Sequence, residues 1–141
     1  MYMMNDKDAI QDTLHRYALH MSNFEIEKAL EFFTEDAIFD ETSVIPGAYL
    51  DGKEKLRAFY MEHSPNMADM MHMYFNFILT DLSENEASST TSLLLQSSFV
   101  NGESNQLKGY WEDKFRKVDG KWKFTHRKLT LFPRNPYLSE S

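Results

Sequence analysis

The 141-residue chain contains no cysteine, which excludes disulfide bonds, cysteine-ligated zinc and thiol nucleophiles. Its apolar stretches are far shorter than the roughly 20 residues that a membrane-spanning helix needs. The first six residues lack the basic start and the apolar middle of a secretory signal. We therefore expect a cytoplasmic protein without membrane contact.

Basic charge is also scarce, because 15 Lys and Arg residues face 22 Asp and Glu residues and leave a formal net charge of −7. Such a field repels polyanions, so nucleic acid is not an expected partner. No group of His, Asp and Glu residues has the spacing of a metal site, and no glycine-rich phosphate loop is present. We therefore expect no metal and no cofactor.

Aromatic residues and methionine are abundant, with 11 Phe, 7 Tyr and 9 Met. Most of these side chains belong to the hydrophobic core. The surplus favours a pocket for a small apolar or aromatic molecule, because aromatic and Met side chains commonly line such pockets.

The apolar pattern changes from helical spacing to alternation near residue 70, which indicates helices first and long strands afterwards. The expected order is α-α-β-β-α-β-β-β-β, an α+β fold in which three helices cover one face of a curved, mostly antiparallel sheet and form a cone-shaped barrel. We expect a single domain over residues 1–133 and a polar C-terminal tail over 134–141. The helices are predicted near 5–22, 23–33 and 51–64, with strands at 37–40, 49–50, 71–79, 87–100, 106–118 and 121–132.

The predicted strand 71–79 has two different faces, because side chains alternate along a strand. The polar face carries His72, Tyr74 and Asn76, and the apolar face carries the residues Met71, Met73, Phe75, Phe77 and Leu79. In one arrangement the polar face meets solvent and the apolar face meets the core. In the other, the polar face lines an internal pocket and the apolar face packs against another subunit.

The order and spacing of several short motifs resemble the SnoaL-like domains of the nuclear transport factor 2-like superfamily. Relatives in this group include scytalone dehydratase, hexachlorocyclohexane dehydrochlorinase and the small subunit of ring-hydroxylating dioxygenases. The resemblance covers about residues 8–127 and favours the arrangement with the internal pocket. The motifs that carry it are Arg16-Tyr17-Ala18, Phe32-Phe33-Thr34-Glu35-Asp36-Ala37-Ile38-Phe39, Gly52-Lys53-Glu54, His72-x-x-x-Asn76, Gly109-x-Trp111-x-Asp113, Asp119-Gly120-x-Trp122 and Arg127.

For the dehydratase-like members, the resemblance implies a histidine base held by a carboxylate at the end of the first helix, and an arginine that stabilises negative charge on the substrate. His72 and Arg127 occupy the corresponding positions. The carboxylate position carries Ser22, which can orient an imidazole but gives it no charge. Imidazole itself suits the role of base because its pKa lies near neutral pH.

Several alternatives stay open. Arg127 either faces a ligand or pairs with Asp113 across the last hairpin, and a buried arginine usually needs such a partner. Asp40 or Glu41, just after the first strand, could supply the missing carboxylate from another element. We also expect Tyr17, Tyr74, Asn76, Trp111 and Asp113 at the pocket.

Two functions follow from these expectations. The first is a cofactor-free lyase, isomerase or cyclase of the dehydratase kind, with His72 as base. The second is a non-catalytic domain that binds a ligand or forms an oligomeric scaffold. In either case an exposed apolar strand face would associate with a second copy, so we expect a homodimer, with a trimer as the second choice.

Overall fold

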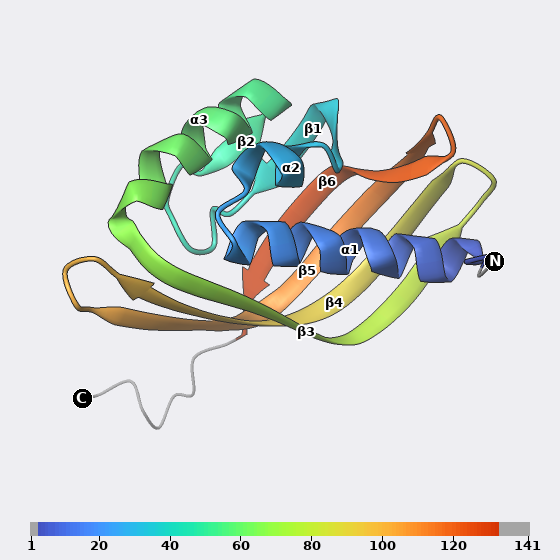
Figure 1. Cartoon of the computed structure of the whole chain (residues 1–141). Helices are drawn as coiled ribbons and strands as arrows, with labels where there is room; N and C mark the ends of the chain where they lie inside the picture. The colour runs from blue at the N-terminus through green and yellow to red at the C-terminus, as the bar shows by residue number, and fades with distance from the viewer. Residues whose placement is uncertain (1–2, 133–141) are drawn as a thin grey trace.

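The computed structural model describes residues 3–132 and shows three helices packed on one six-stranded sheet (Figure 1). The sheet order is β2-β1-β6-β5-β4-β3, and all pairs are antiparallel except β1 with β6. The predicted order and fold class are confirmed. The elements are α1 (Asp6–Ser22), α2 (Ile26–Leu30), β1 (Phe33–Asp40), β2 (Tyr49–Asp51), α3 (Lys53–His63), η1 (Ser64–Asn66), β3 (Met67–Leu82), β4 (Glu86–Phe99), β5 (Ser104–Val118) and β6 (Lys121–Leu131).

Helix α1 forms where apolar residues recur at helical spacing, and its predicted inner stripe is buried against the sheet. The Asn5 side chain accepts a hydrogen bond from the backbone N–H of Asp8 and so caps the N-terminus. The sheet bends beneath α1, and α2 and α3 lie beside β1 and β2 at one end of it (Figure 1). Among residues 3–132 no helix is long and apolar enough to span a membrane.

The long strands pair in sequence order because tight turns join them. Asp119 and Gly120 connect β5 to β6 and both have positive φ, 51° and 78°, as the predicted two-residue hairpin requires. Phe33 was expected at the end of the second helix, but it begins β1 and pairs with Phe124 of β6. Helix α3 ends at His63, just before Pro65, which cannot continue an α-helix, and the chain goes on as η1.

A β-bulge in β3 changes which side chains share a face, so the two faces differ from those that simple alternation predicts. Asn76 has φ 54°, and the pairing register with β4 shifts between Phe75 and Ile78. Beyond the bulge the faces exchange, so Phe77 and Leu79 pack against the core instead of lying on the outer face. The exposed apolar side chains of the outer face are Met71, Phe75 and Ile78, at 55%, 50% and 57% exposure.

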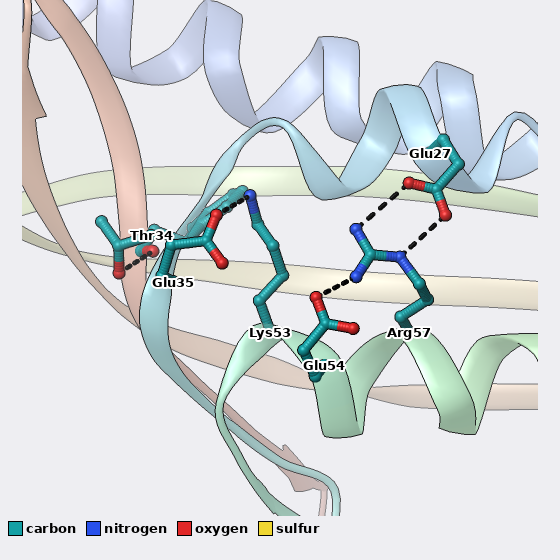
Figure 2. Close-up of polar contacts among 7 residues, drawn as sticks. Glu27, Thr34, Glu35, Lys53, Glu54 and Arg57 are labelled. Atoms are coloured by element: carbon teal, nitrogen blue, oxygen red, sulfur yellow. Dashed lines mark hydrogen bonds and ion pairs between the residues drawn. The ribbon is translucent and has the colours of Figure 1, made fainter.

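Ion pairs fix the position of α3 over the sheet (Figure 2). The Arg57 guanidinium donates to Glu27 of α2 at 2.8 and 3.2 Å and also to Glu54 of its own helix. The Lys53 ammonium donates to Glu35 of β1 at 3.3 Å. These contacts join α2, α3 and β1, so the inner side chains of α3 are held above the concave face of the sheet.

The bulge gives a first prediction. Asn76→Gly should leave the free energy of unfolding nearly unchanged, whereas Asn76→Val should lower it by about 1–2 kcal/mol because a β-branched residue fits poorly at positive φ. Denaturant unfolding checks both variants. Thr80→Val, at an exposed position of β3 without positive φ, is the control and should change stability by under ~0.5 kcal/mol. A harmless Asn76→Val would contradict the conformational role of Asn76.

Candidate ligand cavity

A cavity of about 430 Å³ lies between the concave face of the sheet and the helices. Side chains from α1, α3, the loop after β1 and strands β3 to β6 surround it, and most of them are apolar. Such a volume and composition are typical of sites for small organic molecules. The apolar lining residues are Met21, Phe24, Ile26, Val44, Ile45, Phe59, Met67, Met70, Leu93, Leu95, Phe99, Leu107, Trp111 and Leu129.

The strand register orders the sheet side of the cavity into rows. His72 lies beside Leu95, which lies beside Leu107, so the imidazole has leucine neighbours across the sheet. The adjacent row contains Ser97 and Asn105. Together with His63, Ser64 and Asn66 at the end of α3 and in η1, these residues add polar groups to that end of the cavity, next to Met67, Met70 and Phe99.

His72 is a polar group in an otherwise apolar part of the cavity. Both ring nitrogens are buried, and neither has a hydrogen-bond partner among residues 3–132. Burial, assisted by the nearby Arg127 charge, lowers the pKa of His72 from 6.5 to about 4. The imidazole is therefore neutral at pH 7, when one nitrogen can accept a hydrogen bond and the other can donate one.

Two tyrosine hydroxyls meet at the helical side of the cavity. The Tyr17 and Tyr60 oxygens are 2.5 Å apart, which joins α1 to α3. Burial raises the pKa of both hydroxyls above the usual tyrosine range, so both stay protonated at neutral pH. The Tyr17 ring also packs edge-on to His72, with 6.2 Å between ring centroids. Tyr17 and His72 are thus neighbours.

Glu41 lines the cavity from the loop that follows β1. Burial raises the pKa of its carboxyl group from 4.5 to about 7, although the Arg127 charge opposes the change. Glu41 is the alternative carboxylate that the sequence allowed. No hydrogen bond joins it to the His72 ring, and the same holds for every other described carboxylate.

Arg127 and Asp113 form a fully buried ion pair across β5 and β6. The guanidinium donates two hydrogen bonds to the carboxylate, at 2.7 and 3.2 Å, and a weaker one to the Tyr74 hydroxyl at 3.4 Å. Its central carbon is 4.0 Å from the Trp111 ring centroid and 4.9 Å from that of Tyr17. Because those two rings line the cavity, Arg127 lies behind them and does not face a ligand directly.

The structure places three expected site residues away from the cavity lining. Asn76 is exposed because of the bulge, and its amide lies 3.4 Å from the Ser92 hydroxyl. The Asp40 carboxylate accepts hydrogen bonds from the backbone and hydroxyl of Thr42, which holds it outside the cavity. Ser22 ends α1 and is only partly buried, while Met21 beside it turns inward.

Of the other expected residues, Tyr17 and Trp111 line the cavity, whereas Tyr74, Asp113 and Arg127 lie behind its wall. Tyr60 and His63 also line the cavity and were not expected at the site. The two residues are three positions apart, which places them on the same face of a helix. This spacing was the signal in the sequence that could have identified them. Among the described residues no group of three His, Asp or Glu side chains could hold a metal ion.

Comparison with known proteins gives the fold an evolutionary context. A family model described as SnoaL-like domain matches residues 3–128. A proposed aromatic ring hydroxylase from Novosphingobium aromaticivorans is 25% identical, with a TM-score of 0.87 over 95% of this chain and 94% of that one. A proposed scytalone dehydratase from the same organism is 22% identical, with a TM-score of 0.84 over 91% and 85%.

A third similar structure is LinA, whose type 2 form is named as a hexachlorocyclohexane dehydrochlorinase. LinA is 20% identical, with a TM-score of 0.78 over 96% of this chain and 90% of its own. No match was found among proteins of curated function. The resemblance stated from the sequence motifs is confirmed at the level of family and fold.

The opposite pKa shifts of His72 and Glu41 predict opposite pH effects on stability. The folded state keeps His72 neutral, whereas the unfolded chain lets it take up a proton. The contribution of His72 to the free energy of unfolding is therefore fully present above pH 6.5 and is lost as the pH falls to about 4. The folded state keeps Glu41 protonated, so its contribution is complete below pH 4.5 and is lost as the pH rises to about 7.

Relative to wild type, His72→Gln should therefore gain about 3 kcal/mol of unfolding free energy when the pH is lowered from about 7 to 4. Glu41→Gln should gain about as much when the pH is raised from about 4.5 to 7. Denaturant unfolding across this pH range checks both. Parallel pH profiles for wild type and the variants would contradict these protonation states.

Proposed function

Because the chain belongs to the SnoaL-like domain family, we propose that it binds a small, uncharged, largely apolar or aromatic molecule in the cavity, with His72 as a polar contact. The carrying observation is the pair of buried, unpartnered ring nitrogens inside an apolar cavity. Burying polar atoms without partners is costly. A ligand hydroxyl or carbonyl that supplied a partner would recover this free energy on binding.

A second candidate function is cofactor-free lyase, isomerase or cyclase chemistry with His72 as general base. The neutral imidazole and the adjacent Tyr17 hydroxyl favour it, because one could accept a proton while the other stabilises a developing oxyanion. The absence of a carboxylate bonded to the imidazole within residues 3–132 weighs against it. The names of similar structures, a proposed dehydratase and a dehydrochlorinase, are compatible with such chemistry.

Binding and turnover can be tested with a panel of phenols, enones and lactones, by calorimetry and by product analysis. His72→Phe should weaken the binding of a phenol about tenfold, since one hydrogen bond is lost, while a hydrocarbon of similar size keeps its affinity. His15→Phe, at an exposed position of α1, is the control. Equal phenol affinity in wild type and His72→Phe would refute the contact.

The same panel separates binding from catalysis. Turnover that disappears in His72→Phe would support the general base. Turnover that survives this substitution would exclude His72 from the chemistry while leaving binding to be judged from affinity.

We further propose that two copies associate through the outer face of β3. This strand is an edge strand, and Met71, Phe75 and Ile78 on its outer face are about half exposed. Exposed apolar side chains gathered on an edge strand are typical of association surfaces. This outer face differs from the five-residue face expected from simple alternation, because Phe77 and Leu79 pack against the core instead.

Light scattering at micromolar concentration should give the mass of a dimer. The double variant Phe75→Glu/Ile78→Glu should give a monomer that keeps the wild-type circular dichroism, because buried charges would oppose association. Lys55→Glu, exposed on α3, should remain dimeric. A wild-type monomer would overturn the association, and a trimer would overturn the two-fold arrangement.

A further inference from the structure

The backbone around Glu41 holds its side chain toward the cavity. The Glu41 N–H donates to the Ala48 carbonyl, and its carbonyl accepts from the N–H groups of Val44 and Ile45, each at 2.9 Å. The preceding residue, Asp40, is turned toward Thr42. Five backbone or side-chain hydrogen bonds thus shape a loop in which Glu41 is the carboxyl group that lines the cavity.

The Glu41 carboxyl group lines the cavity and has no hydrogen-bond or ion-pair partner among the described residues, a property it shares with the His72 ring nitrogens and the Trp111 indole N–H. The Arg127 charge is directed at Asp113, and the Tyr17 and Tyr60 hydroxyls bond to each other. Val44 and Ile45, from the same loop, make the adjoining cavity wall apolar. A free carboxyl in such surroundings resembles the polar group that orients a ligand in an apolar pocket.

Glu41 and His72 approach the cavity from different sides. Strand β1, which precedes Glu41, and strand β3, which carries His72, are separated by β6, β5 and β4 in the sheet. The sheet is curved (Figure 1), and both residues line the same cavity. A ligand bound between them could form a hydrogen bond with Glu41 at one end and with His72 at the other, with its apolar part in between.

We propose that Glu41 is a second ligand-binding residue of the cavity, and that its carboxyl group donates a hydrogen bond to an oxygen acceptor of an uncharged ring compound, such as a ketone or lactone. This inference rests on the proposed binding function and names the class of ligand. A carboxylate ligand would be disfavoured, since ionised Glu41 would repel it and no unpaired cation of the described residues faces it.

Protonation of Glu41 is consistent with this role, because burial raises the pKa of its carboxyl group to about 7. Burial raises the pKa of the three nearby tyrosines and lowers that of His72, so these groups do not account for a titration near pH 7. Arg127 and Asp113 are paired with each other. His63, on α3, also lines the cavity. The titratable or charged groups that line the cavity with Glu41 are Tyr17, Tyr60, His63 and His72. Tyr74, Asp113 and Arg127 lie behind its wall.

The test uses 1-tetralone as the ketone, naphthalene as the probe without an acceptor, and 1-naphthoate as the anion. Binding is followed by calorimetry. Glu41→Leu removes the donor, and Glu41→Gln keeps a neutral donor that does not titrate. Leu93→Trp fills the cavity and controls for binding elsewhere.

At about pH 6, Glu41→Leu should weaken 1-tetralone binding about tenfold and leave naphthalene binding unchanged. Wild-type affinity for 1-tetralone should fall about tenfold between pH 6 and pH 8.5, whereas Glu41→Gln should bind equally at both. A pH dependence retained in Glu41→Gln would assign the titration to another group, with His63 the first to examine, and would overturn the donor role.

The outcomes also separate this inference from the proposed function. If 1-tetralone and naphthalene bind and Leu93→Trp abolishes both, but Glu41→Leu binds them like wild type, only the role of Glu41 is overturned. If neither probe binds wild type, the cavity function and the role of Glu41 fail together. Circular dichroism and thermal unfolding of each variant establish that loss of binding is not loss of fold.

Discussion

The buried Arg127–Asp113 ion pair is the interaction on which the cavity depends. Two charges with no exposed surface are tolerated because the hydrogen bonds are bidentate and the guanidinium lies against aromatic rings. The pair joins β5 to β6 behind Trp111 and Tyr17, which form part of the cavity wall. Breaking one partner would leave an uncompensated charge in the interior, so the pair also constrains the register of the last hairpin.

The electrostatics of the cavity follow from this arrangement and from burial. The Arg127 charge acts together with burial on His72 and against burial on Glu41, so the imidazole is neutral at pH 7 while the carboxyl is close to half protonated. The tyrosine hydroxyls remain protonated. The cavity thus presents hydrogen-bonding groups with little net charge, and this favours uncharged molecules over ions. Ser97, Asn105 and the η1 region add polar groups at one end of the mainly apolar cavity, and these groups can orient a ligand.

Local patterns in the sequence predicted much of the fold because each pattern has a local physical cause. Helical spacing predicted the inner stripe of α1, and Asp119-Gly120 predicted the last hairpin through its need for positive φ. The same reasoning failed at Asn76. One residue in the left-handed region exchanges the faces of the rest of β3, and an asparagine within an alternating segment does not by itself distinguish a bulge from a regular strand.

The sequence by itself determined the order of helices and strands, the richness in aromatic residues and the presence of a histidine on the polar face of a long strand, since these depend on residue type and spacing. Only the tertiary structure decided that Arg127 binds Asp113, that Glu41 rather than Asp40 faces the cavity, and that His72 lacks a carboxylate partner among the described residues. These outcomes depend on how strands far apart in the chain curve around one space. The distance between two side chains across that space does not follow from the number of residues between them in the sequence.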